Sequence, residues 1–214
     1  MYFSASSSKD SSKHCVGAAV SSSITGPYTP EDSPIACPLD KGGAIDPDGY
    51  DDDGDLYVLY KVDGNSLNQG GTINPTPIML QALKDDGVTP DGDPVQLLDR
   101  DEGDGVLIEA PSLKKSNGTY FLTFSSNMYD TTDYDVSYAT ASAIKGPYTK
   151  TDEPLLVSGD SSSVGPLAGP GGADFSANES KIVFHAFKNG HDINDGRAMF
   201  TSEISFSGDT ISIV

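Results

Sequence analysis

The sequence lacks tryptophan, has two cysteines and three histidines, and contains no long uninterrupted run of apolar residues. Without a run of about 18 apolar residues, no segment is expected to span a bilayer as a helix. Two cysteines are too few for a disulfide framework or a thiolate zinc site, so Cys15 and Cys37 form either one bridge or two buried thiols. Basic residues are also scarce: 13 Lys and Arg stand against 32 Asp and Glu, for a net charge of −19 over 214 residues. This balance argues against nucleic acid and membrane partners, which need a basic surface.

Several catalytic and targeting signals are missing as well. There is no Gly-x-Ser-x-Gly nucleophile elbow and no phosphate-binding loop, and the acidic loops 51–55 and 99–105 do not have the spacing of a calcium-binding EF-hand. The chain shows no secretory leader, although the sequons Asn117-Gly118-Thr119 and Asn178-Glu179-Ser180 favour secretion. We therefore expect an extracellular location for the full-length parent.

What the sequence does contain is a repeat. An acidic or polar turn followed by an apolar, aromatic-rich strand recurs about every 60 residues, in "LYVLYKV" (56–62), "YFLTFSS" (120–126) and "KIVFHAF" (181–187). Each strand follows a comparable segment: "AIDPDGYD" from residue 44, "LIEAPSLK" from 107 and "AGPGGADF" from 168. Ile45 and Ile108 are 63 positions apart, and "GAAVSSSITGPYT" (17–29) matches "SYATASAIKGPYT" (137–149) two periods later.

This period, built from short strands and Gly, Pro or Asp turns with hardly any helical pattern, predicts an all-β fold of β-propeller blades; a β-sandwich is the alternative. The opening segment "MYFSAS" aligns with the second strand of the repeat, so Met1 falls in the middle of a blade. We expect one incomplete propeller domain over residues 1–214, with blade units of about 1–40, 41–104, 105–164 and 165–214.

Two carboxylates stand at corresponding places in the repeat. Asp46 in "IDP" and Glu109 in "IEAP" are predicted to occupy equivalent positions on the first strands of successive blades, which line the propeller axis. Two carboxyl groups that share a pocket cannot both ionise easily, so one of them can act as a proton donor, as glycosidic-bond cleavage requires. Alternatively, Asp46 caps a turn and Glu109 is a surface residue.

Taken together, these motifs resemble glycoside hydrolase family 43, the five-bladed propeller arabinanases, arabinofuranosidases and β-xylosidases. The resemblance rests on "GGAIDPDGYDDDGDLYVLY", "IEAPSLKKSNGTYFLTFSSNMY", "YATASAIKGPYT" and "GPGGADF…VFHAF", and it covers nearly the whole chain in the right order. It implies about three and a half of the five blades, with the first blade and the start of the second missing. It also implies an inverting hydrolase of arabinose- or xylose-containing plant polysaccharides or oligosaccharides.

The resemblance also assigns roles to the two carboxylates. Glu109 matches the general acid, and Asp46 matches the carboxylate that orients this acid and tunes its pKa. No position matches the third carboxylate, the general base that activates water. We therefore expect this chain by itself to hydrolyse glycosides poorly or not at all, and an inactive propeller fragment or a sugar- or protein-binding module is the alternative.

Three further residues are candidates for binding sugar. His185 and Arg197 stand where the family's last blade supplies polar side chains, with a core or surface role as the alternative. Tyr129, after the strand at 120–126, could stack on a sugar ring or fill the core. Gly172 stands where many family members carry a histidine near an ion on the axis, so we expect no metal or other cofactor, with an axial calcium ion as the alternative. The expected partner is an arabino- or xylo-oligosaccharide, bound by a monomer.

Overall fold

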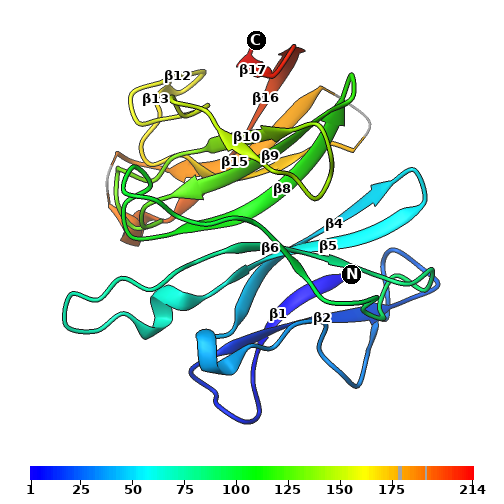
Figure 1. Cartoon of the computed structure of the whole chain (residues 1–214). Helices are drawn as coiled ribbons and strands as arrows, with labels where there is room; N and C mark the ends of the chain where they lie inside the picture. Colours follow the sequence, from blue (N-terminus) through cyan, green and yellow to red (C-terminus); the bar gives the residue numbers. More distant parts are fainter. Residues whose placement is uncertain (178–179, 191) are drawn as a thin grey trace. The chain divides into compact units, whose positions relative to one another are not determined.

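The computed structural model describes residues 1–177, 180–190 and 192–214, so Asn178 and Glu179 of the second sequon lie outside the described residues. The chain is all-β and divides into two compact units, residues 1–99 and 100–214 (Figure 1). In the part of the chain that the structure describes, three short 3-10 turns interrupt the strands: η1 (Leu39–Lys41), η2 (Gly64–Leu67) and η3 (Ile193–Asp195). Among the described residues, no helix has the length and apolarity that crossing a membrane demands.

The first unit contains two antiparallel sheets. The sheet orders are β1-β2-β3 and β4-β5-β6-β7. The strands are β1 (Tyr2–Ser6), β2 (His14–Val20), β3 (Thr29–Pro30), β4 (Ala44–Asp52), β5 (Asp55–Val62), β6 (Ile78–Ala82) and β7 (Val95–Leu98). Alternate residues of β5, Val58, Tyr60 and Val62, join Val16 and Ala18 of β2 in a shared core, as the period of two in a strand requires.

A disulfide fixes the segment after β3. Cys15 in β2 is bonded to Cys37, with a Cα–Cα distance of 4.5 Å. Next to it, Val16 and Ala36 form an isolated antiparallel bridge. Of the two states left open for the cysteines, the structure has the bridge.

The described residues of the second unit form two four-stranded antiparallel sheets and a small hairpin. The sheet orders are β11-β10-β9-β8 and β14-β15-β16-β17, and β12 pairs with β13. The strands are β8 (Ile108–Ser116), β9 (Thr119–Ser126), β10 (Ser137–Ala141), β11 (Thr149–Lys150), β12 (Ser161–Ser162), β13 (Gly165–Pro166), β14 (Gly171–Phe175), β15 (Lys181–Phe187), β16 (Arg197–Ser207) and β17 (Thr210–Ile213). Side chains of both sheets, among them Phe121, Tyr138, Ile182 and Phe184, form one core.

Two of the turns that precede the repeated strands are two-residue hairpin turns, and the third, before β15, includes residues 178–179, which lie outside the described residues. Asp53 and Gly54 connect β4 to β5, and Asn117 and Gly118 connect β8 to β9; all four have positive φ, between 50° and 105°. Asp, Asn and Gly tolerate this left-handed backbone better than other residues, which is why Asp-Gly and Asn-Gly mark such turns. The first sequon therefore presents Asn117 on an exposed hairpin tip.

The two "GPYT" segments also have the same local structure. Gly26-Pro27 and Gly146-Pro147 are both cis peptide bonds. In each segment the tyrosine hydroxyl donates to the carbonyl four residues earlier, Tyr28 to Ile24 at 3.0 Å and Tyr148 to Ile144 at 3.1 Å. The sequence repeat thus corresponds to a structural repeat.

Candidate active site

The first strands of the three four-stranded sheets share one backbone irregularity. In each, the pairing register shifts by one residue: between Ile45 and Asp48, between Glu109 and Ser112, and between Gly171 and Asp174. The residue after the last regular pair has a positive φ in every case, 55° at Asp46, 51° at Ala110 and 60° at Gly172. This is a β-bulge, a device that bends a strand and re-aims its side chains.

The bulges correct one expectation from the sequence. Asp46 is equivalent to Ala110 and Gly172, whereas Glu109 is equivalent to Ile45 and Gly171. The alignment of Ile45 with Ile108 is therefore wrong by one residue. The last paired residues of the two hairpins, Asp52 and Ser116, are 64 positions apart rather than 63. Each sheet has its own copy of the bulge, and Asp46 and Glu109 occupy adjacent positions, not the same position, in the two copies.

Asp46 lies in the first unit, one residue after the strand partner of a buried lysine. Its side chain is half-buried, and its backbone adopts the left-handed conformation that Asp accepts more readily than most residues. Its neighbour Ile45 pairs with Lys61 of β5. The Lys61 ammonium group lies 3.2 Å from a carboxylate oxygen of Asp63, and its side chain is almost completely buried. This buried lysine thus forms an ion pair with Asp63, two residues further along the chain.

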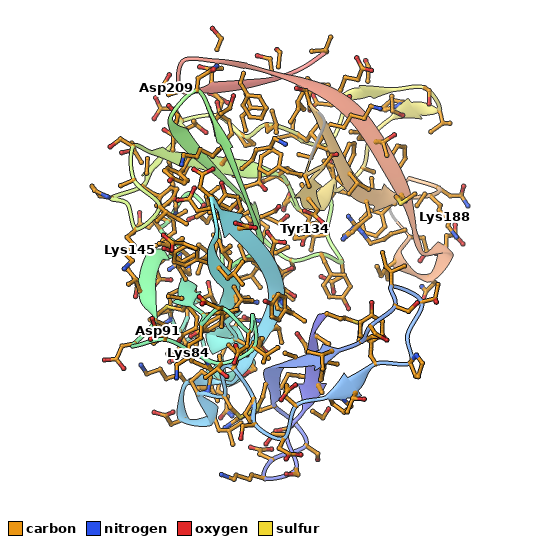
Figure 2. The ribbon with its side chains drawn as sticks, turned by 90° about the vertical axis from the view of Figure 1, so that its right-hand side faces the viewer. Lys84, Asp91, Tyr134, Lys145, Lys188 and Asp209 are labelled. Carbon is orange, nitrogen blue, oxygen red and sulfur yellow. A yellow bond between two sulfur atoms is a disulfide. The ribbon has the colours of Figure 1, made fainter. Side chains whose placement is uncertain are left out.

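Glu109 lies in the second unit, on β8. Its side chain is half-buried, and its Oε1 accepts a hydrogen bond of 2.9 Å from the hydroxyl group of Tyr134. Tyr134 comes from the loop between β9 and β10, and its side chain lies inside the unit, whereas Lys145, Lys188 and Asp209 point outward (Figure 2). The carboxyl group is thus held by a buried hydroxyl donor.

His185 and Arg197 are brought together beside Tyr134. The imidazole ring of His185, on β15, stacks on the Tyr134 ring with a centroid distance of 6.1 Å and an interplanar angle of 19°. The guanidinium group of Arg197, at the start of β16, donates from Nε to His185 Nδ1 at 2.5 Å. It also donates to the carbonyl groups of Tyr129, Gly169 and His185.

These contacts settle the protonation state of His185. Burial, and secondarily the charge of Arg197, lower the pKa of His185 to about 4, so the ring is neutral at neutral pH. Because Nδ1 accepts a hydrogen bond from Arg197, the proton of the neutral ring is on Nε2. The ring therefore offers a donor at Nε2, directly over Gly172, where a Cβ atom would lie 2.4 Å from this nitrogen.

The family model "Glycosyl hydrolases family 43" matches residues 1–211. The chain belongs to this family. Comparison with curated proteins finds no match.

Solved structures similar to this family 43 chain include three enzymes. A thermostable family-43 glycoside hydrolase is 24% identical, with a TM-score of 0.83 and coverage of 100% of this chain and 70% of the other. An endo-1,4-beta-xylanase from Bacteroides thetaiotaomicron is 26% identical, with a TM-score of 0.75 and the same coverage. An alpha-L-arabinofuranosidase from Lactobacillus brevis is 19% identical, with a TM-score of 0.74 and coverage of 99% and 70%. These likenesses support the β-propeller as the fold class of the chain.

Sequence reasoning missed Lys61, Ser125 and Tyr134 of this family 43 chain. Lys61, Ser125 and His185 are the partners of the last regular residue before each bulge, and only His185 was singled out. Ser125 is fully buried and accepts a hydrogen bond of 2.9 Å from the backbone N–H of Gly172. A polar side chain near the end of each otherwise apolar strand was the available signal. Tyr134 was missed because nothing in a loop sequence indicates where its side chain points.

The contact that Tyr129 makes with Arg197 involves its backbone and not its ring. Its side chain is 51% exposed, and the structure uses its backbone carbonyl group, which accepts from Arg197 Nη1 at 2.8 Å. A role of the ring in stacking on sugar stays a prediction. Within residues 1–177, 180–190 and 192–214, no group of three or more His, Cys, Asp or Glu side chains is arranged to hold a metal ion.

Proposed function

We propose that this chain is the acid-bearing part of an inverting glycoside hydrolase that acts on arabinose- or xylose-containing polysaccharides or oligosaccharides. The observation that carries the proposal is Glu109, which stands in the "IEAP" motif of a family 43 chain with its carboxyl group held by Tyr134. The substrate class is supported by similar structures described as a xylanase, an arabinofuranosidase and an endo-arabinase. As part of the same proposal, the chain covers about three and a half blades of a five-bladed propeller from a secreted protein.

In this mechanism Glu109 is the general acid. Its proton passes to the glycosidic oxygen as the bond from that oxygen to the anomeric carbon breaks, while a water molecule attacks the carbon from the opposite face and gives up a proton to a general base. The family resemblance gives Asp46 the role of the carboxylate that orients the acid and tunes its pKa, and this role is part of the proposal. The bulges support these different roles, because they place Asp46 and Glu109 at adjacent rather than identical positions of the repeated backbone.

The general base has no match in this sequence, which favours a second candidate function. A chain with an acid but no base would bind an arabino- or xylo-oligosaccharide without cleaving it at a useful rate. General acid–base groups commonly contribute about 10² to 10⁴ to the rate, so hydrolysis in water is expected to be slower by a factor of that order.

An experiment with an added nucleophile distinguishes the two candidate functions, the acid-bearing hydrolase and the binding module. Azide ion needs no deprotonation, so it can attack the anomeric carbon of an aryl arabinofuranoside or aryl xyloside without a base. The bond from this carbon to nitrogen forms, the bond to the aryl oxygen breaks, and Glu109 gives its proton to the departing oxygen. The products are a glycosyl azide of inverted configuration and a phenol.

We expect slow phenol release in water, faster release with sodium azide, and loss of the azide-dependent rate for a phenyl glycoside in Glu109→Gln. Glu102→Gln, which changes an exposed glutamate near the beginning of the same unit, is the matched control. Binding of xylo- or arabino-oligosaccharides without phenol release under either condition would support the binding module instead. Rapid hydrolysis in water that Glu109→Gln abolishes would show that a base is present and would contradict the proposal of a missing one.

A further inference from the structure

The contacts around Glu109 point to a residue that controls how this carboxyl group is presented. We propose that Tyr134 is a positioning residue, which holds the Glu109 carboxyl group in one orientation, and that His185 and Arg197 hold Tyr134. This inference rests on the proposed role of Glu109 as the acid. All four residues belong to the second unit, and they come from β8, the loop between β9 and β10, β15 and β16.

The first support is the burial of Tyr134. Its side chain is 2% exposed, yet its hydroxyl group reaches Glu109 Oε1 at 2.9 Å. A buried tyrosine hydroxyl group needs a partner, and here its partner is the carboxyl group itself. Because Oε1 is held by a fixed donor, rotation of the carboxyl group about its last bond is restricted, and the direction in which it can deliver a proton is restricted with it.

The second support is the surface on which the Tyr134 ring lies. A Cβ atom on Gly171 would lie 1.9 Å from Tyr134 Cε1, so the ring packs directly against the Gly171 backbone. Gly171 occupies, in the sheet of β14, the position that Glu109 occupies in the sheet of β8. The same place in the repeat thus carries the acid in one sheet and lacks a side chain in the next, and the tyrosine ring fills that space.

The third support is the pair of side chains, His185 and Arg197, that contact the Tyr134 ring. His185 stacks on Tyr134, and the Arg197 guanidinium carbon lies 5.3 Å from the centroid of the Tyr134 ring and 4.7 Å from that of Phe187. Arg197 is itself fixed by the His185 imidazole and by three backbone carbonyl groups. A cation over an aromatic face and two stacked rings leave Tyr134 little freedom to move.

The decisive variant is Tyr134→Phe, which removes only the hydroxyl group. The matched control is Tyr138→Phe, which makes the same change at another buried tyrosine of the unit, one whose hydroxyl group accepts from the Ile211 N–H instead. Both variants are made in the full chain. The first readout is the ¹³C spectrum of glutamate carboxyl groups at pH 7, with the Glu109 signal assigned by its loss in Glu109→Gln, together with contacts between the Tyr134 hydroxyl proton and Glu109 in the unmodified chain.

We expect the hydroxyl proton of Tyr134 to contact Glu109 and the Glu109 carboxyl signal to move in Tyr134→Phe but not in Tyr138→Phe. An unmoved signal in Tyr134→Phe, or the absence of the contact in the unmodified chain, overturns the proposal. This readout needs no turnover. It therefore tests the positioning role even if the proposed hydrolytic function fails, and a chain without any phenol release would contradict only that function.

The second readout is the dependence of azide-assisted cleavage on the leaving group. A dinitrophenyl group departs almost without protonation, whereas an unsubstituted phenyl group needs the acid. We expect Tyr134→Phe to lower kcat/KM for the phenyl glycoside by about 10- to 100-fold and to have much less effect on the dinitrophenyl glycoside. An equal loss for both substrates would indicate a merely structural role and would overturn the proposal.

Discussion

Gly171→Ala is the perturbation that most directly tests the packing around the candidate acid. It adds one methyl group to β14 and leaves Glu109 itself unchanged, but the methyl group collides with the ring of Tyr134, the hydrogen-bond partner of Glu109. The added Cβ atom would lie 1.9 Å from Tyr134 Cε1, 2.2 Å from Cδ1 and 2.7 Å from Cζ. Carbon atoms in contact are separated by about 3.5 to 4.0 Å, so the ring must move by roughly 1.5 Å or more.

This displacement has two costs. Overpacking a well-filled core destabilises by about 1 to 3 kcal/mol, and the stiffer unfolded chain of an alanine variant offsets about 0.4 to 1 kcal/mol of this. The hydrogen bond of 2.9 Å to Glu109 would also lengthen beyond hydrogen-bonding range, at a further cost of about 1 kcal/mol. We therefore expect a net loss of about 1 to 3 kcal/mol in the free energy of unfolding.

Urea unfolding of the full chain measures this loss, and a double-mutant cycle identifies its cause. Gly103→Ala is the control, because it lies in an exposed loop without positive φ and its nearest contact, a carboxylate oxygen, is 3.2 Å away. In a Tyr134→Ala background the methyl group has room, so Gly171→Ala should then cost little. If the alanine costs the same in both backgrounds, the contact with the Tyr134 ring is not its cause and the reasoning is refuted.

Three further predictions concern stability. Burial, followed by the charge of Arg197, lowers the pKa of His185 from 6.5 to about 4, so its neutral form contributes stability that is complete above pH 6.5 and lost as the pH falls toward 4. Urea unfolding should show the wild type losing about 1 kcal/mol relative to His185→Asn between pH 7 and 4, after discounting for solvent screening, and a pH-independent difference would contradict this. Burial raises the pKa of Asp135 from 3.8 to about 6, so its protonated form contributes stability that is present below pH 3.8 and lost as the pH rises through 6. Asp135→Asn should therefore stabilise the chain by about 1 kcal/mol at pH 7 and by little at pH 4 in the same assay, whereas an equal gain at both values would exclude the carboxyl charge as the cause. Reduction of the bridge between Cys15 and Cys37, which are 22 positions apart, should cost about 3 kcal/mol, and a Cys15→Ser/Cys37→Ser variant should be insensitive to reductant.

Much of the fold could be predicted because it depends on local chemistry. A tight hairpin turn requires a left-handed backbone, which Asp53-Gly54 and Asn117-Gly118 accept. The residues on either side of these turns alternate with the period of a strand. The equivalence of the two "GPYT" segments also followed from their letters alone. These features specify strands and turns without information from distant residues.

The register within the hairpins could not be predicted in the same way. A β-bulge adds one residue to one strand, and the hydrophobic pattern does not identify which residue is the extra one. An alignment based on the apolar residues therefore matched Ile45 with Ile108, whereas the backbone pairing of the strands makes Ile45 equivalent to Glu109. The role of Tyr134 could not be predicted for a different reason: the direction of a loop side chain depends on tertiary packing.

The repeated bulge explains how one backbone can carry different chemistry in successive sheets. Its last regular position holds Ile45, Glu109 or Gly171, and the residue paired with it is Lys61, Ser125 or His185. A bulge is defined by its backbone, so these side chains can vary while the bend is kept. The variation is nevertheless coupled between sheets, because the tyrosine that holds Glu109 needs the empty space above Gly171. The position of the candidate acid therefore depends on the glycine of the next sheet. A side chain at Gly171 would displace Tyr134 and so disturb Glu109 without contacting it.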